Sequence, residues 1–150
     1  MVDHSNHLIQ SFRTVCGKDL VDPSLLVDPA EAARQLFSLS NTVVLSHGLQ
    51  DGPEGPILNY GNEAALIQFG ATWEQLTTLH SSHTAEAGDR EARARLMEGV
   101  LQNGFVNDYS GVRIALDGRR FRIENTYVWN VMVDGKRLGQ AACFDGVTEL

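Results

Sequence analysis

Two Asp-Gly dipeptides divide the C-terminal part of the chain into three extended segments, and this pattern constrains the fold more than any other feature. Asp117-Gly118 and Asp134-Gly135 each lie between runs of β-branched and aromatic residues. Asp-Gly favours a two-residue hairpin turn because both turn positions need a positive φ. The chain after Gly104 is therefore predicted to form an antiparallel meander of three strands.

The two turns also predict which side chains share a face of the meander. If the first dipeptide is the whole turn, Ile114 lies opposite Phe121, and the second dipeptide likewise places Tyr127 opposite Ala142. The apolar residues of the predicted inner face are Val112, Ile114, Phe121, Ile123, Tyr127, Trp129, Val131, Leu138, Ala142 and Phe144. Arg113 is then expected on the opposite face, across from Arg122.

Polar residues interrupt the predicted inner face at Asp108, Ser110, Asn125 and Gln140. A buried polar group without a partner costs about 1–3 kcal/mol, so these groups must bond one another, water or a ligand. Asp108 and Ser110 lie near a strand start, where mutual bonding or contact with water is expected. For Asn125 and Gln140, pairing within the protein and binding of a ligand both remain open. The hypothesis is a small cavity between the sheet and the helices that follow Tyr60.

Capped helices and two short strands are predicted before the meander. An apolar stripe at Leu8, Phe12 and Val15 predicts a helix that ends at Gly17. Residues 42–46 and 57–60 are typical of strands, and residues 29–37, 62–70, 72–79 and 89–103 of helices. Within this series, Asn62 is expected to cap the helix that Gly70 ends.

Composition indicates a single folded domain and limits its partners. A chain of 150 residues suits one hydrophobic core, and a net charge of -7 would be repelled by phosphates, so no nucleic-acid partner is expected. Neither a secretory leader nor an apolar run long enough for a membrane span occurs, so a cytoplasmic protein without membrane contact is expected. Cys16 and Cys143 lack metal-ligand spacing, and no metal site is predicted.

Several sequence strings occur in an ordered series from about Leu8 to the end of the chain. They are VVLSHG, ILNYGNEAAL, WEQLTTL, HTAE, GFVNDYSGVRI, GRRFRIENTYVWN and GQAACF. Together they resemble the MEKHLA domain family, which is similar to the PAS domains. The resemblance implies a PAS-like five-stranded antiparallel sheet with short helices on one face and N-terminal helices. Residues 1–40 are then a helical extension and residues 41–150 the PAS-like MEKHLA domain, in one structural unit.

The resemblance also implies a sensor or regulatory domain that binds a small ligand between the helices and the inner sheet face. The predicted ligand-binding residues are Asn125, Gln140, Ser110, Tyr127, Trp129, Phe121 and Met97. PAS relatives hold flavin, haem or small metabolites at this place. The cysteine motif of the flavin photosensors is absent, and only Met97 and His83 are candidate haem ligands on the helical side, so neither cofactor is expected and the ligand stays unknown.

Two other classes of function remain open. The domain is alternatively an interaction module without a ligand, which contacts a partner through its outer sheet face or its N-terminal helices. For the sensor reading as well, a homodimer through the Leu8, Phe12 and Val15 stripe is predicted, unless this stripe covers its own domain. The third reading is a small cone-fold isomerase-like enzyme, in which Asp108 and Tyr127 face each other and shuttle a proton. Turnover of a substrate is not expected, and no catalytic residue is assigned.

Overall fold

A computed structural model of the protein describes residues 1–50, 52–86 and 90–150, apart from the side chains of residues 90, 91 and 93. The helices are α1 (Val2–Cys16), α2 (Pro29–Ser38), α3 (Glu63–Phe69), α4 (Trp73–Leu76) and α5 (Arg90–Asn103), with the short 3-10 helices η1 (Pro23–Val27) and η2 (Ser81–Thr84). The strands are β1 (Val43–His47), β2 (Leu58–Gly61), β3 (Phe105–Ile114), β4 (Arg120–Val133), β5 (Lys136–Phe144) and β6 (Gly146–Glu149). Within these described residues, no helix has both the length and the hydrophobicity needed to cross a lipid bilayer.

The strands of the described chain form one antiparallel sheet in the order β2-β1-β5-β4-β3. The predicted α+β class with a five-stranded antiparallel sheet is therefore confirmed. β6 adds one strand that the sequence analysis did not expect. β5 pairs with residues 127–133 of β4, and β6 pairs with residues 121–124, so the long strand β4 changes partner along one edge.

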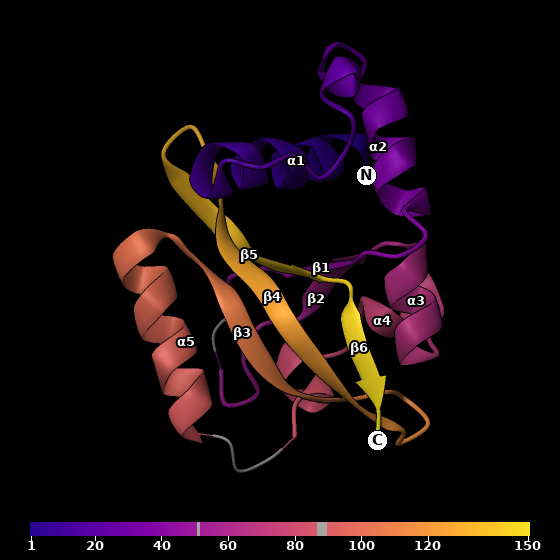
Figure 1. Ribbon diagram of the computed structural model, residues 1–150, viewed down its shortest axis with the longest axis vertical. Helices are drawn as coiled ribbons and strands as arrows, with labels where there is room; N and C mark the ends of the chain where they lie inside the picture. The colour runs from indigo at the N-terminus through magenta and orange to yellow at the C-terminus, as the bar shows by residue number, and fades with distance from the viewer. Residues whose placement is uncertain (51, 87–89) are drawn as a thin grey trace.

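Helices cover both faces of this sheet (Figure 1). The outer face lies under α1, and the inner face is turned toward α3, α4 and α5. The buried residues that join α1 to the outer face are Leu8, Ile9, Phe12, Val44, Tyr60, Trp129, Val131, Ala141 and Cys143. The buried residues on the inner side are Val43, Leu45, Leu58, Ala65, Phe69, Leu76, Ala115, Phe121, Ile123 and Phe144.

The hairpin between β3 and β4 differs from the prediction by one residue. Ile114 lies opposite Arg120, and Arg113 lies opposite Phe121. The turn contains three residues, because the Ala115 amide bonds to the Arg119 carbonyl and Gly118 takes the left-handed conformation at φ 87°. Three-residue hairpin loops of this kind place glycine at the left-handed position. The predicted pairing of Ile114 with Phe121 is therefore wrong, and Arg113 lies on the inner face.

The second hairpin confirms the predicted two-residue turn but not the pairing beyond it. Asp134 and Gly135 have φ values of 50° and 78°, as a turn with two left-handed residues requires. A bulge between Val131 and Met132 then shifts the register, so Tyr127 pairs with Cys143 rather than with Ala142. An extra residue in one strand turns the side chains that follow to the other face.

A second irregularity lies in β4 at Asn125, whose φ is 51°. Phe121 and Ile123 before it belong to the inner core, whereas Trp129 beyond it belongs to the core under α1. Asn125 itself is exposed. The predicted inner-face positions of Asn125, Tyr127 and Trp129 are therefore wrong, because the left-handed residue breaks the alternation of side chains along the strand.

Substitutions at Asn125 test this account of β4. A left-handed conformation costs about 1–3 kcal/mol for an unfavourable residue, whereas glycine adopts it freely. We expect Asn125→Val to lower the free energy of unfolding in urea by about 1–3 kcal/mol, and Asn125→Gly to change it much less. Equal stability of the two variants would contradict a left-handed residue at this position.

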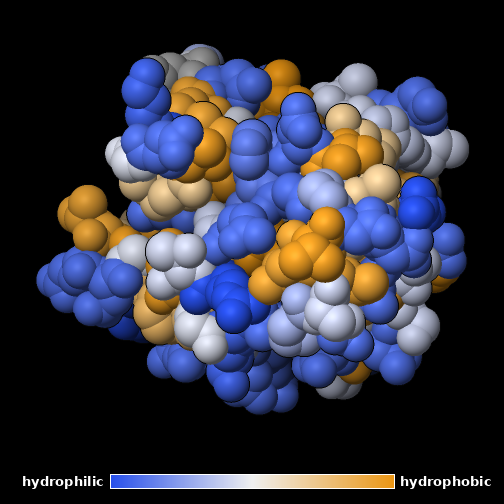
Figure 2. All heavy atoms as spheres, turned by 90° about the horizontal axis from the view of Figure 1, so that it is seen from above, coloured by the Kyte–Doolittle hydropathy of each residue, from blue (hydrophilic) through white to orange (hydrophobic). Residues whose placement is uncertain are grey.

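The apolar stripe of α1 covers the chain's own sheet. Leu8 exposes 0% of its surface and Phe12 exposes 3%. Figure 2, seen from the side where α1 and α2 lie, shows separate hydrophobic patches among hydrophilic residues. A partner therefore has no access to Leu8 and Phe12 in this packing. The homodimer stays a prediction, and it would need a different surface.

A polar contact fixes the beginning of α1 to the sheet. His4 Nε2 lies 2.9 Å from the Ser46 hydroxyl of β1, and the Ser46 hydroxyl donates to Asn59 of β2 at 2.5 Å. Burial lowers the pKa of His4 below its usual value of 6.5, and the nearby His7 and the N-terminal amine lower it further. The neutral imidazole is thus the form that the folded chain favours.

This contact predicts a pH dependence of stability. Because the pKa of His4 is lower in the folded chain, its contribution is complete above about pH 6.5 and is lost as the pH falls through that value toward the folded pKa. We expect urea unfolding to show a larger loss of stability between pH 7.5 and pH 5.5 for the wild type than for His4→Gln. The same loss in both proteins would show that His4 does not titrate with folding.

Candidate functional site

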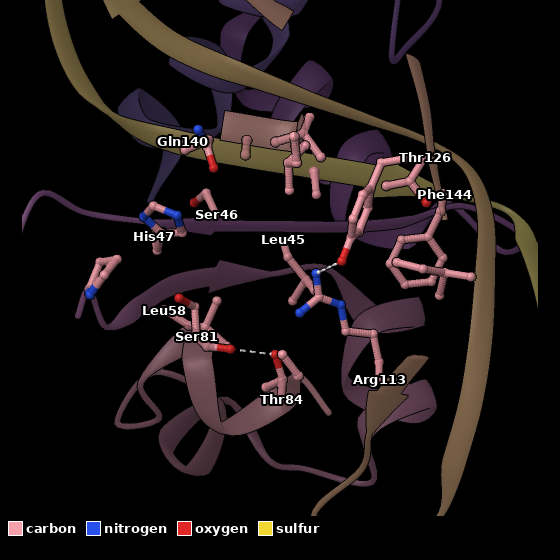
Figure 3. Close-up of a pocket in the computed structure, with 18 of the residues that line it drawn as sticks. Leu45, Ser46, His47, Leu58, Ser81, Thr84, Arg113, Thr126, Gln140 and Phe144 are labelled. Atoms are coloured by element: carbon pink, nitrogen blue, oxygen red, sulfur yellow. Dashed lines mark hydrogen bonds between the residues drawn. The ribbon is translucent and has the colours of Figure 1, made fainter. Parts of the chain in front are cut away.

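A cavity of about 390 Å³ lies between the inner face of the sheet and the segments η2 and α5 (Figure 3). Its walls come from β1, β3, β4, β5 and the loop after β1. Its size falls within the roughly 300–1,000 Å³ that is usual for small-molecule sites. The large apolar residues of the wall include Leu45, Leu58, Phe69, Ile123, Val128 and Phe144. Such a wall suits the apolar part of a small organic molecule.

Thr126 is the most informative polar residue of the cavity wall. It follows the bulge at Asn125, it lines the cavity, and it exposes only 1% of its surface. Its hydroxyl has no hydrogen-bond partner in the structure. A buried hydroxyl without a partner costs about 1–3 kcal/mol, so a hydrogen-bond partner for this group would stabilise the folded chain.

A second polar group comes from the pair of strands β1 and β5. Gln140 exposes 8% of its surface, lines the cavity and is the register partner of His47. His47 also lines the cavity, and its Nδ1 lies 2.9 Å from the Gly48 carbonyl oxygen. Figure 3 shows Gln140 and His47 at one end of the cavity and Thr126 toward the other end. Polar groups therefore lie at separate places along a mostly apolar wall.

The third polar feature is the pair formed by Arg113 and Tyr109 on β3. Arg113 Nη2 donates a hydrogen bond to the Tyr109 hydroxyl at 3.1 Å. The guanidinium carbon lies 5.5 Å from the centre of the Tyr109 ring, within the range of a cation–π contact. Both residues line the cavity and are partly buried. The three-residue turn described above is what brings Arg113 to this face.

Some of the predicted ligand-binding residues meet at this cavity. Gln140 and Met97 line it, although Met97 is 49% exposed. Phe121 is buried on the inner side with its ring 5.3 Å from that of Phe69, and it does not contribute to the cavity wall. Ser110 is exposed and lines a separate groove between α5 and β3.

The other predicted residues lie away from the cavity. Asn125 is exposed at the bulge. Trp129 is fully buried under α1, where its ring centre lies 4.6 Å from that of Phe12 and its Nε1 donates to the Ser11 hydroxyl at 3.0 Å. Tyr127 also packs on Phe12, at 5.3 Å between ring centres. Trp129 and Tyr127 therefore hold α1 on the outer face.

The two residues of the isomerase-like reading do not line a common pocket. Asp108 is exposed and lines the groove between α5 and β3. Tyr127 contacts Phe12 on the outer face of the sheet. The prediction that both residues lie on the inner face is wrong for Tyr127, although Tyr109 lies opposite Thr126 in the register that the prediction assumed. Among the described residues, neither the cavity nor the groove between α5 and β3 is lined by both Asp108 and Tyr127.

Sequence reasoning missed Thr126, Arg113, Tyr109 and His47 as cavity residues. One signal was present, since the run from Thr126 to Val133 is apolar at every odd position and also has apolar residues at the even positions Val128 and Met132. A strand with apolar residues in both sets is buried on both faces. That pattern favours separate contacts for Thr126 and Tyr127, on opposite sides of the sheet.

The cavity does not fit the thiol chemistry of a flavin photosensor. The described residues that line it include no cysteine. Cys143 lies under α1, on the opposite face from Gln140, as the alternation of side chains along β5 requires. Burial, together with smaller effects of Cys16 and Asp145, raises the pKa of its thiol to about 12. Of the candidate haem ligands, Met97 lines the cavity, whereas His83 is exposed and contacts Glu54 outside it.

Solved structures show that the fold is a PAS fold. The PAS domain of a protein from Colwellia psychrerythraea superposes with a TM-score of 0.65 at 14% identity, covering 82% of this chain and 98% of that chain. An RNA-binding light-oxygen-voltage receptor gives a TM-score of 0.62 at 19% identity, covering 88% of this chain and 35% of that chain. The Rhodobacter sphaeroides LOV protein gives 0.58 at 14% identity, covering 78% and 64%.

Sequence comparison identifies the family. A search of curated protein sequences finds no significant match to this chain. The family model described as the MEKHLA domain matches residues 2–148, which include α1, the strands β1 to β5 and all but the last residue of β6. The predicted resemblance is thereby confirmed, and the chain belongs to the MEKHLA domain family, with the fold of a PAS domain.

Proposed function

We propose that this chain is a sensor or regulatory domain that binds a small organic ligand in the cavity between the inner sheet face and the helices. The apolar wall and the few separate polar groups support this function, because ligand sites in proteins commonly combine these two features. The likeness to PAS and light-oxygen-voltage structures supports the same place on the fold. Catalytic turnover is not part of the proposal.

The Thr126 hydroxyl is the observation that carries this proposal. It is buried and has no partner, and it lies on a cavity rather than within a packed core. A ligand that offers a hydrogen-bond donor or acceptor at this point would remove the free-energy cost of the unpaired hydroxyl. Binding would therefore stabilise the folded chain by mass action.

Strands β4 and β5 can transmit the effect of ligand binding to the outer face, because they contact both the cavity and α1. Gln140 and Ala141 both line the cavity, and Ala141 also packs among the buried residues under α1. On β4, likewise, Thr126 lines the cavity and Trp129 packs under α1. A ligand that moves these strands would alter the surface on which α1 packs. The regulatory output is therefore a change in the packing of α1.

The loop before β2 closes one side of the cavity. The Ser81 amide donates to the Pro56 carbonyl at 2.9 Å, and both residues line the cavity. His80 Nδ1 lies 2.8 Å from the Gly55 carbonyl oxygen, and the Ser82 hydroxyl donates to the Glu54 carbonyl at 2.8 Å. These contacts hold the loop against η2.

Native mass spectrometry of the chain purified from its own host tests the proposal. We expect an added mass in the range of a small organic molecule, which is lost when the chain is unfolded. We also expect the small-molecule fraction of a host extract to raise the melting temperature of the stripped protein. A bare chain mass, together with no change in melting temperature, would contradict the proposed function.

Thr126→Val gives a sharper test, because valine keeps the shape of threonine and removes the hydroxyl. We expect the ligand-free variant to gain about 1 kcal/mol in the free energy of unfolding, and we expect it to retain less of the copurified molecule. Thr148→Val, at an exposed position of β6, is the matched control and should change neither quantity. A loss of stability in Thr126→Val with unchanged retention would show that the hydroxyl serves folding alone.

A further inference from the structure

Two buried side chains of the cavity wall carry neutral polar groups without a partner. The Thr126 hydroxyl has no hydrogen-bond partner in the structure. Gln140 exposes 8% of its surface, and no residue that the structure describes bonds its side-chain amide. Both residues line the cavity. Because buried polar groups are nearly always hydrogen-bonded, these two groups indicate where a bound molecule would supply partners.

The charged side chains in the described part of the wall, in contrast, have partners within the chain. Arg113 binds Tyr109 as described above, and Arg137 Nε donates to Asn130 Oδ1 at 3.0 Å. The Glu86 carboxylate accepts a hydrogen bond of 2.6 Å from an arginine outside the wall. An ion that enters a mostly apolar cavity loses its hydration, and this loss is costly unless an opposite charge is available to it. The wall therefore favours an uncharged ligand.

The distance between the two unpaired groups sets the shape of such a ligand. Gln140 pairs with Asn130 across β5 and β4, and Asn130 lies four residues after Thr126 on β4. A strand rises about 3.3 Å per residue, so the two positions lie about 13 Å apart along the sheet. Figure 3 shows Gln140 and Thr126 toward opposite ends of the cavity. A ligand that contacts both groups must be elongated, with an apolar body against the wall between them.

The chemistry of the Gln140 amide selects the group that meets it. A side-chain amide presents a donor and an acceptor side by side, and another carboxamide offers the complementary pair. An ionised carboxylate only accepts hydrogen bonds, so it leaves the carbonyl oxygen of Gln140 without a donor. The Thr126 hydroxyl both donates and accepts, so it is satisfied by a hydroxyl or a carbonyl oxygen at the other end of the ligand.

From these groups we infer that the ligand is an elongated, uncharged molecule with a carboxamide at the Gln140 end. A hydroxyl or carbonyl group binds Thr126 at the other end, and an apolar body joins the two. This inference rests on the proposed function of the cavity and specifies the chemical class of its ligand. It assigns no ligand contact to the charged side chains of the wall.

The probe for this inference is ω-hydroxyoctanamide, compared with three relatives that each differ by one group. In ω-hydroxyoctanoate a carboxylate replaces the carboxamide, in octanol a methyl group replaces it, and octanamide lacks the hydroxyl. Isothermal titration gives the Kd of each compound for the full chain. We expect the carboxylate to bind about tenfold or more weakly, because its charge must leave water. We expect octanol and octanamide to bind about two- to tenfold more weakly, as the loss of a hydrogen bond predicts.

Two variants and one control assign each preference to its residue. Thr126→Val should abolish the preference for ω-hydroxyoctanamide over octanamide and keep the preference over octanol. Gln140→Leu should abolish the preference over octanol and keep the preference over octanamide. Gln10→Leu, at an exposed position of α1, is the matched control and should change neither preference. Thermal unfolding of each variant shows whether it is folded.

The outcomes distinguish this inference from the proposed function. A carboxylate that binds as tightly as the carboxamide, or preferences that survive both substitutions, would overturn the inference and leave a ligand-binding cavity. An ionised copurified molecule would do the same. If no probe binds, an uncharged copurified molecule that Thr126→Val and Gln140→Leu each retain less well would support the inference, and equal retention would overturn it. Binding of no probe to a chain without any copurified molecule would overturn both proposals.

Discussion

The left-handed backbone at Asn125 is the constraint on which the two faces of the sheet depend. In a regular strand, side chains alternate strictly, and Thr126 would then share a face with Arg122 and Glu124. The bulge interrupts this alternation, so Thr126 lines the cavity while Trp129 lies under α1. It also lies where β4 exchanges β5 for β6 as its partner. One unusual residue thus determines what both faces of β4 contact.

The cavity and α1 lie on opposite faces of the same two strands, β4 and β5. Burial of large apolar side chains is the main favourable contribution to such packing, at roughly 1.5–3 kcal/mol for each fully buried residue. Leu8 and Ile9 of α1 are both fully buried on the outer face. A small displacement of β4 or β5 changes that interface directly, because packed interiors have few voids to absorb it. A ligand in the cavity would therefore influence α1 without touching it.

The local elements of the fold were predictable from the sequence, and the pairing of the strands was only partly so. The Asn62 side chain accepts the Ala65 amide hydrogen at 3.0 Å, and Gly70 takes the left-handed conformation that ends α3, as their residue types indicated. The two Asp-Gly turns were also located correctly. The register of a hairpin depends on whether its turn contains two residues or three, and an Asp-Gly dipeptide fits both turns. In the first hairpin, the third turn residue is what places Arg113 on the face of the cavity.

The candidate site was less predictable, because it depends on which helices cover which face. An apolar stripe such as that of α1 must be buried, but its periodicity does not name the surface that it covers. Gln140 was identified because it interrupts an apolar face, whereas Thr126 was overlooked in a run with apolar residues on both sides.

Nuclear Overhauser contacts of the indole N–H of Trp129 test the central claim most directly. The account predicts contacts with Ser11 and Phe12 of α1; contacts with Met97 of α5 instead would place Trp129 on the inner face and contradict it.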